Sequence, residues 1–253
     1  LHACGDEGYG RMSSPKTILE SLSNEIEKNE LDGIRILVSA GPTREPIDPV
    51  RFISNYSSGK MGYALAESAR NLGADVELIS GPVNIKMPDN IKMTSVETSA
   101  EMLNAVLGKI SYCDVFISAA AISDYRPSHK LTEKHKSSDG ELVIRLERGE
   151  DILKLAKETK AGLYAVGFSA ETNNISDNAK IKLKKKNVDM IISNEANHQK
   201  GLGFESDMNE VCIIEKDSVL KVPKNTKKII ADIILSKIAK NIRGNLIKIK
   251  NAR

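Results

Sequence analysis

Residues 54–62 read Ser54-Asn55-Tyr56-Ser57-Ser58-Gly59-Lys60-Met61-Gly62, and they separate a strand-like run from a helical pattern. The strand-like run ends in Gly41-Pro42-Thr43-Arg44-Glu45-Pro46. The pattern that follows repeats apolar residues at helical spacing: Met61, Leu65, Ala69 and Leu72. Hydroxyls and glycines ahead of a helix leave backbone N–H groups that can bind an anion at the positive end of the helix. The stretch therefore predicts a strand–turn–helix unit with a phosphate-binding turn.

Two better-known phosphate-binding motifs do not fit this turn. A Walker-type loop needs glycine where Ser54 stands and a magnesium-binding Ser or Thr where Met61 stands. A Rossmann fingerprint needs an acidic residue after its second strand to hold the ribose hydroxyls. Here the strand at 75–79 continues into Ser80-Gly81-Pro82. A Gly/Ser turn that binds no ligand remains the structural alternative.

Tyr56 and Lys60 have the Tyr-x-x-x-Lys spacing of short-chain dehydrogenases. In those enzymes the pair lies on a helix far downstream of the glycine loop, so the match carries little weight. The spacing still leaves an NAD(P)-dependent short-chain-type reductase as the alternative function for this chain.

Composition excludes several classes of protein. With 253 residues, 40% hydrophobic and 28% charged, the chain is long enough for one large α/β domain or two small ones. A net charge of +3 gives little reason to expect a nucleic-acid partner. No apolar run approaches the ~18 residues needed to span a bilayer, so we expect no membrane segment and a cytoplasmic location. Cys113 and Cys212 lie in strand-like runs and are interpreted as small buried hydrophobes.

Strands and helices alternate along most of the chain. The predicted strands cover 34–40, 75–80, 113–119, 163–168 and 188–193, and the predicted helices cover 60–72, 99–110, 151–159 and 175–186. The strands are continuous apolar runs, as parallel strands covered on both faces require. This pattern predicts an α/β fold with a doubly wound, mostly parallel, Rossmann-like sheet.

The remaining segments are less regular. An amphipathic helix is expected over 16–32, and the polar stretch 123–140 is interpreted as a flexible flap beside the phosphate site or as a disordered insertion. A strand at 141–147 follows, and runs at 209–215 and 218–222 predict a C-terminal β-hairpin. The last helix, 225–240, should bury Ile229, Ile233 and Ile234 and leave four lysines in solvent: Lys227, Lys228, Lys237 and Lys240.

The unusual residues cluster at the carboxyl ends of the predicted strands, where open parallel sheets bind ligands. Ala119-Ala120-Ala121 would let a ligand approach the backbone, although small residues also permit helix packing. Lys134 and Lys136, with Lys182 and Lys186, are candidates to neutralise a polyphosphate, although a lone lysine is usually a solvated charge. No zinc spacing or Gly-x-Ser-x-Gly elbow occurs. The residues predict a nucleotide-using α/β enzyme with a phosphate-bearing or acidic substrate.

Five runs in order resemble one family, the phosphopantothenoylcysteine synthetase domain of bifunctional coenzyme A biosynthesis proteins. The runs are residues 40–51 and 54–62, Ala119-Ala120-Ala121-Ile122-Ser123-Asp124-Tyr125-Arg126, Val166-Gly167-Phe168-Ser169-Ala170-Glu171-Thr172-Asn173, and Gly203-Phe204. The resemblance covers residues 33–253, which it implies to be a ligase domain. It implies that 4′-phosphopantothenate is activated by CTP and Mg²⁺ as an acyl-cytidylate and then joined to cysteine. Family members also dimerise through this domain.

The resemblance assigns roles to individual residues. Asn55 would contact the acyl group during amide formation, and Lys134 of the flap would stabilise the α-phosphate, although the family's last flap lysine is replaced by Ser137. Arg51 would join Asn55 in binding phosphopantothenate. The implied CTP-binding residues are Gly41, Ser57, Ser58, Gly59, Ser118, Ala119, Ala120, Asp124, Lys134, Gly149, Glu150, Asp151, Ile152, Phe168, Lys182 and Lys186. Gly149-Glu150 stands where the family usually has Asn-Pro, and no metal ligand is assigned.

Residues 1–32 resemble the end of a preceding flavoprotein domain, phosphopantothenoylcysteine decarboxylase, followed by a linker. Cys4 matches the cysteine of that domain that donates a proton to the enethiol intermediate. We expect the chain to be part of a longer polypeptide that would form a larger oligomer. The flavin, FMN, would bind only in the decarboxylase domain, so this chain alone is not expected to decarboxylate.

Overall fold

A computed structural model of the chain describes residues 13–15, 30–136, 140–171, 175–195 and 206–251. Most of the predicted helix at 16–32 lies outside these residues, and so does Cys4. Within them, no helix is both long enough and apolar enough to cross a membrane.

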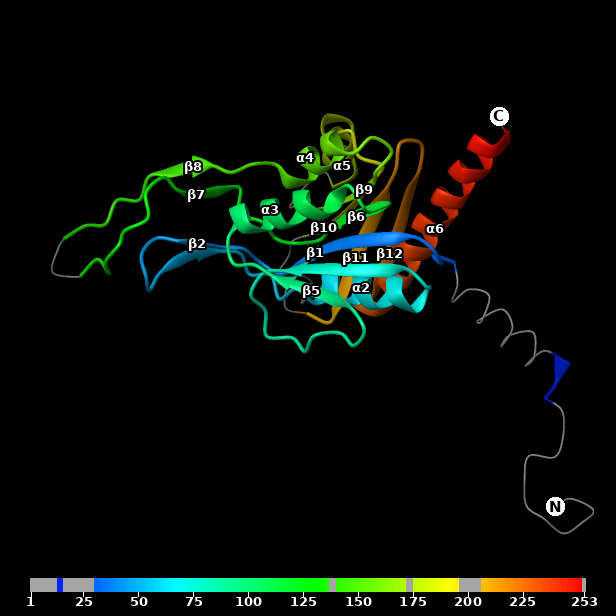
Figure 1. The fold of residues 1–253 in the computed structure, drawn as a ribbon, viewed down its shortest axis with the longest axis horizontal. Helices are drawn as coiled ribbons and strands as arrows, with labels where there is room; N and C mark the ends of the chain where they lie inside the picture. The colour runs from blue at the N-terminus through cyan, green and yellow to red at the C-terminus, as the bar shows by residue number, and fades with distance from the viewer. Residues whose placement is uncertain (1–12, 16–29, 137–139, 172–174, 196–205, 252–253) are drawn as a thin grey trace, which may run out of the picture.

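The centre of the molecule is an eight-stranded sheet with the order β12-β11-β10-β9-β6-β1-β4-β5 (Figure 1). Its strands are β1 (Arg35–Ala40), β4 (Asp75–Ser80), β5 (Lys92–Ser95), β6 (Val115–Ser118), β9 (Tyr164–Glu171), β10 (Met190–Glu195), β11 (Met208–Ile214) and β12 (Val219–Thr226). The first six run parallel, and β11 and β12 form an antiparallel hairpin at one edge. The predicted doubly wound sheet and C-terminal hairpin are confirmed. The strand order reverses between β1 and β6, which is where such sheets bind ligands.

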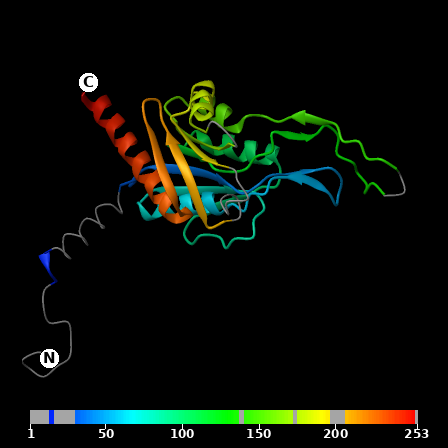
Figure 2. The same cartoon turned by 180° about the vertical axis from the view of Figure 1, so that it is seen from behind.

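Helices cover both faces of the sheet (Figures 1 and 2). α2 (Lys60–Asn71) and α6 (Lys227–Asn251) pack on one face, and α3 (Ser99–Ile110), α4 (Ile152–Thr159) and α5 (Ile175–Lys186) pack on the other. Neighbouring strand residues therefore enter different cores: Val38 packs on the α2 side and Leu37 on the α3 side. Burial on both sides explains why the sequence shows continuous apolar runs.

Two short hairpins project together from one side of the sheet (Figure 1). The first joins β2 (Arg44–Pro46) to β3 (Phe52–Ser54), and the second joins β7 (Tyr125–Pro127) to β8 (Leu146–Arg148). We call them the arms. The Leu131 N–H donates to the Ile47 carbonyl across 2.9 Å, and this bond ties the arms to each other. Phe52, Val50 and Val143 are exposed on them.

The arms correct one prediction. The strand expected at 141–147 forms only over 146–148, and it pairs with β7 outside the main sheet. All three β8 residues are exposed, so no apolar face draws the segment into the core. β5 was missed for a related reason, because Met93 is its only large apolar residue.

The last helix corrects a second prediction. α6 begins at Lys227 and buries Ile230, Ile234 and Ile238, whereas Ile229 is 43% exposed. Lys227, expected in solvent, is only 6% exposed. α6 has so many apolar residues that two orientations about its axis would each bury an apolar face. Packing against α2 selects the orientation that buries Lys227.

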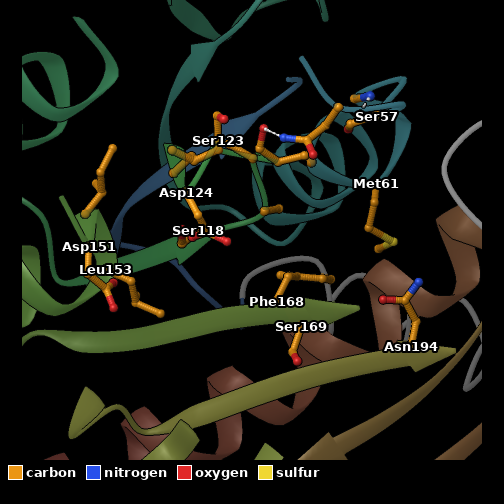
Figure 3. A pocket seen from close by; sticks show the side chains of 18 of the residues that line it. Ser57, Met61, Ser118, Ser123, Asp124, Asp151, Leu153, Phe168, Ser169 and Asn194 are labelled. Carbon is orange, nitrogen blue, oxygen red and sulfur yellow. Dashed lines mark hydrogen bonds between the residues drawn. The ribbon is translucent and has the colours of Figure 1, made fainter. Parts of the chain in front are cut away.

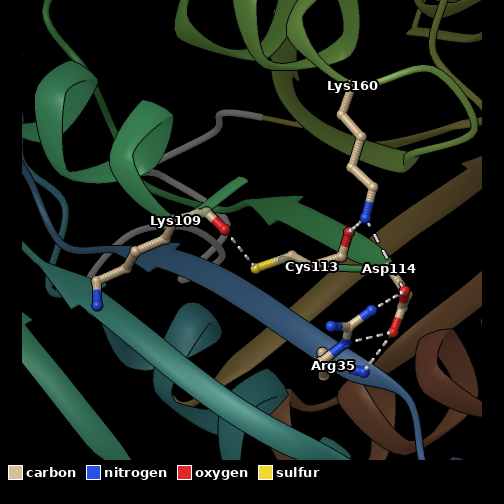
Figure 4. A network of polar contacts seen from close by, with 5 residues as sticks. All are labelled: Arg35, Lys109, Cys113, Asp114 and Lys160. Carbon is tan, nitrogen blue, oxygen red and sulfur yellow. Dashed lines mark hydrogen bonds and ion pairs between the residues drawn. The ribbon is translucent and has the colours of Figure 1, made fainter. Parts of the chain in front are cut away.

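A network of polar contacts lies at the amino-terminal ends of the central strands (Figure 4). The Arg35 guanidinium donates to both carboxylate oxygens of Asp114, at 2.9 and 3.1 Å. Burial opposes ionisation of Asp114, but these hydrogen bonds outweigh it and lower the pKa of the carboxyl. Burial raises the pKa of the neighbouring Cys113 thiol to about 11, so this cysteine is a packing residue, as predicted.

Candidate active site

A cavity of about 480 Å³ opens at the carboxyl ends of the strands, across the point where the strand order reverses (Figure 3). It is lined by residues from β6, β9 and β10, from the turn before α2, and from helices on both faces of the sheet. Most of the predicted site residues lie in this wall: Asn55, Ser57, Ser58, Gly59, Ser118, Ala119, Ala120, Asp124, Gly149, Glu150, Asp151, Ile152, Phe168, Lys182 and Lys186. The structure therefore brings segments 130 residues apart into one pocket.

The turn before α2 forms one wall of this pocket. Gly59 is the N-cap residue that precedes α2, and its φ of 78° lies in the left-handed region that favours glycine. A Cβ on Gly59 would come within 2.7 Å of Val83 Cγ1 and 3.4 Å of the Gly41 Cα. Gly41 thus lies behind the turn and does not line the pocket. No side chain among the described residues caps α2, and its first N–H groups lie beside the pocket.

Asn55 is fixed by the segment that follows β6. Its Nδ2 donates to the Ala121 carbonyl across 2.9 Å, and the Ala121 N–H donates to the Gly41 carbonyl at the same distance. Asn55 is exposed apart from this bond. The backbone segments that follow β1 and β6 therefore orient the Asn55 side-chain amide at the mouth of the pocket.

The opposite wall holds two lysines of α5. Lys182 Nζ lies 3.0 Å from the Ser169 hydroxyl, and Lys186 Nζ lies 2.8 Å from the Asp151 carboxylate. Asp151 also starts α4, where its carboxylate accepts from the Lys154 N–H at 3.2 Å. These contacts place both ammonium groups on the pocket side of α5. They provide positive charge about one helical turn apart.

Besides Gly41, three predicted site residues do not lie in this wall. Arg51 is on the first arm, where it pairs with the buried Asp48 and donates to the His135 carbonyl at 2.6 Å. Lys134 is exposed on the second arm, next to His135. Cys4 lies outside the described residues.

Sequence reasoning missed several residues of the pocket. Lys227 lines it, together with Arg148, Ser169, Asn194 and Asn209. Lys60 also lines it, and the predicted phosphate-binding turn contained this lysine but gave it no role of its own. Asn194 could have been found, because it follows a predicted strand and lies at the end of β10 (Figure 3). Lys227 gave no such signal, since its burial depends on how α6 packs.

None of the pocket residues that the structure describes favours the reductase alternative. The described residues at the carboxyl end of β4 are Ser80, Gly81 and Pro82, none of which can hold ribose hydroxyls as an acid does. Lys60 Nζ is 2.6 Å from the Asp207 carboxylate, whereas Tyr56 is 77% exposed and does not line the pocket. Among the described residues, no group of three or more His, Cys, Asp or Glu side chains could hold a metal ion alone.

Comparisons with known proteins agree on one family. A family model described as the DNA/pantothenate metabolism flavoprotein C-terminal domain matches residues 31–242. The chain is 40% identical, over 93% of its length, to the coenzyme A biosynthesis bifunctional protein CoaBC of Vibrio vulnificus strain CMCP6, and it spans 59% of that relative. The crystal structure of the C-terminal domain of a CoaBC protein matches 85% of this chain and 99% of its own, with a TM-score of 0.73 and 43% identity.

A more distant structure, a Cab2 H337A mutant in complex with phosphopantothenate-cysteine, shares the fold. It covers 95% of this chain and 97% of its own, with a TM-score of 0.70 and 15% identity. The matching family model spans most of the described fold, including the strands, the arms and the pocket. The chain therefore belongs to the family of the DNA/pantothenate metabolism flavoprotein C-terminal domain.

Proposed function

We propose that this chain is a ligase that joins 4′-phosphopantothenate to L-cysteine in coenzyme A biosynthesis, with CTP as the activating nucleotide. The observation that carries the proposal is the pocket itself, in which three of the family-like runs, 54–62, 119–126 and 166–173, meet at the reversal of strand order. Support also comes from the CoaBC relatives and from the phosphopantothenate-cysteine bound to the Cab2 mutant.

The first half-reaction activates the acid. A carboxylate oxygen of phosphopantothenate attacks the α-phosphorus of CTP, the bond to the β-phosphate oxygen breaks, and pyrophosphate leaves with both bonding electrons. Negative charge grows on phosphate oxygens during this step, so fixed donors and cations should stabilise it. The turn at Ser57, Ser58 and Gly59 lies at the positive end of α2, and Lys182 and Lys186 offer charge from the opposite wall.

The second half-reaction forms the amide. The cysteine amine attacks the acyl carbonyl, CMP leaves with the electrons of the acyl–oxygen bond, and the nitrogen loses a proton. The carbonyl oxygen becomes an oxyanion on the way, and a neutral donor placed beside it lowers the barrier. We assign that position to Asn55, whose amide is already oriented by the Ala121 carbonyl.

Lys134 and Arg51 act in this proposal from the arms. Both residues lie outside the pocket wall, and the Arg51 bond to the His135 carbonyl keeps them together. Lys134 can act on the α-phosphate, and Arg51 on phosphopantothenate, only if the arm tips reach a pocket.

We also propose that the chain forms a homodimer, because the arms expose Phe52, Val50 and Val143 to solvent.

The nucleotide would carry Mg²⁺ into the pocket. Mg²⁺ bound to phosphates keeps several waters and needs only one or two protein carboxylates. Asp124 fits this requirement because it lines the pocket, whereas Asp151 is already paired with Lys186. The ion would neutralise phosphate charge, and Asp124 would hold it.

The division of the chain follows the same proposal. Residues 33–253 would form the ligase domain, and residues 1–32 would be the end of a flavoprotein decarboxylase domain, with Cys4 as its proton donor, plus a linker. FMN and decarboxylation would belong to that domain, and the cell compartment would be the cytoplasm. The chain spans 59% of its CoaBC relative, so the proposals on FMN, decarboxylation and the compartment concern a protein longer than this chain.

One assay tests the ligase. The chain is mixed with 4′-phosphopantothenate, cysteine and Mg²⁺, with either CTP or ATP, and pyrophosphate and the amide product are measured. We expect both products with CTP and far less of each with ATP. Omitting phosphopantothenate should abolish pyrophosphate release. Absence of pyrophosphate with both nucleotides would refute the proposed function.

The lysines of α5 give a second test. Lys182→Met and Lys186→Met should each raise the KM for CTP by about tenfold, because each removes a charge-assisted contact to phosphate. Lys185→Met is the matched control, since Lys185 is exposed on the same helix and does not line the pocket. If the KM for CTP of Lys182→Met and Lys186→Met equals that of Lys185→Met, this wall of the pocket does not bind the nucleotide.

A further inference from the structure

Two lysines that the ligase chemistry above does not use lie at the α2/α6 end of the pocket. Lys60 is the first residue of α2, and Lys227 is the first residue of α6. Both line the cavity, and Lys227 is only 6% exposed. The α5 lysines belong to the opposite face of the sheet, so the pocket has cations at both ends.

Asp207 connects the starts of the two helices. Its carboxylate accepts from Lys60 Nζ at 2.6 Å, and its backbone carbonyl accepts from the Lys227 N–H at 2.9 Å. The Asp207 side chain is 82% exposed, so the Lys60–Asp207 ion pair lies at the rim and should contribute little to stability. Lys227 lies deeper, and the buried Asn209 lines the same cavity.

Burying Lys227 costs free energy, because a lysine loses hydration and here also faces a second lysine. Burial, and after it the charge of Lys60, lowers the pKa of Lys227 to about 8, while Asp207 acts in the opposite direction. Such a group in the wall of an open polar pocket indicates a binding role more than a structural one. The positive ends of two helices converge on the same place, and they also favour an anion.

We propose that Lys60 and Lys227 form a seat for a phosphate group at the α2/α6 end of the pocket. This inference rests on the proposed function, which supplies two phosphate groups able to occupy the seat. One is the terminal part of the nucleotide triphosphate, which leaves as pyrophosphate. The other is the phosphate ester of phosphopantothenate. Two neighbouring ammonium groups, one of which also contacts the Asp207 carboxylate, can donate charge-assisted hydrogen bonds to a phosphate from either source.

Binding measurements on the whole chain test the seat without turnover. Pyrophosphate is titrated calorimetrically into the unmodified chain and into Lys60→Met, Lys227→Met, Lys227→Arg and Lys228→Met. We expect Lys60→Met and Lys227→Met to bind about tenfold more weakly and Lys227→Arg to restore much of the affinity. Lys228→Met is the matched control, because Lys228 is the exposed next residue of α6. Thermal unfolding of each variant verifies that it is folded.

Further probes identify which phosphate uses the seat. If it is the nucleotide's, Lys227→Met weakens CTP and leaves CMP unchanged. If it is the ester's, the variant weakens phosphopantothenate and leaves pantothenate unchanged. Equal binding of every probe by Lys227→Met and Lys228→Met would overturn the seat. Lys227-dependent pyrophosphate binding in a chain that makes no amide would support the seat while refuting the ligase.

The pH dependence of binding gives an independent readout. The ammonium form of Lys227 holds the anion and the neutral amine does not, so affinity should fall as pH rises through about 8. Sulfate is the suitable probe because it stays a dianion across that range. Lys227→Arg should remove this step, since arginine stays charged. Lys60 and Asp207 face the same group and remain in both proteins, so an unchanged step in Lys227→Arg would contradict the assignment.

Discussion

Asn55→Asp is expected to release pyrophosphate from CTP but to form amide about 10²–10³ times more slowly, which is the usual effect of removing one oxyanion donor. The aspartate has no N–H to donate, and its charge would repel both the Ala121 carbonyl, now 2.9 Å from Nδ2, and the developing oxyanion. The acyl-cytidylate should therefore accumulate on the protein. Rapid quenching followed by mass analysis of the bound nucleotide measures it.

Two further variants make this result specific. Asn104→Asp introduces the same charge on the exposed face of α3, away from the pocket wall, and should form amide at the normal rate. Lys134→Gln should fail earlier, with little pyrophosphate and no acyl-cytidylate, because its proposed role is on the α-phosphate. Normal amide formation by Asn55→Asp would remove Asn55 from the second half-reaction, whatever the other variants do.

The parallel core could be predicted because its signal is local and redundant. The predicted strands at 34–40 and 113–119 contain apolar runs that are buried on both faces, and these two strands and the one at 75–80 formed within one or two residues of the predicted bounds. The turn at residues 54–62 could be predicted for a different reason. Gly59 and Gly62 stand where only a residue without Cβ fits, so their spacing reflects geometry.

Features that depend on distant packing could not be predicted. Lys227 was expected in solvent, since a lysine at a helix start normally faces water, and only the contact of α6 with α2 turns it into the pocket. The segment 123–140 was interpreted as a flap, but the two hairpins that form the arms were missed, because short strands with exposed side chains have no burial pattern. Arg51 and Lys134 match the family motif in sequence, yet the arms place them outside the pocket wall.

Gly62→Ala is expected to destabilise the chain by about 1–3 kcal/mol, the usual cost of overpacking a close contact. An added Cβ would lie 2.5 Å from the Ala40 Cβ, 3.1 Å from the Ala40 Cα and 3.3 Å from the Ser39 carbonyl oxygen. None of these atoms is the end of a flexible side chain, so α2 would have to move away from β1. The Ser57–Gly59 turn would move with it, and CTP binding should weaken as well.

Gly108→Ala provides the matched control, because Gly108 is also helical and a Cβ there meets nothing within 4 Å. Alanine should stabilise that helix by about 0.5–1 kcal/mol through its better helix propensity. Both variants gain the same propensity, so the difference between their urea midpoints isolates the contact between α2 and β1. If the two variants unfold at the same urea concentration, close packing of α2 on β1 does not hold the phosphate-binding turn in place.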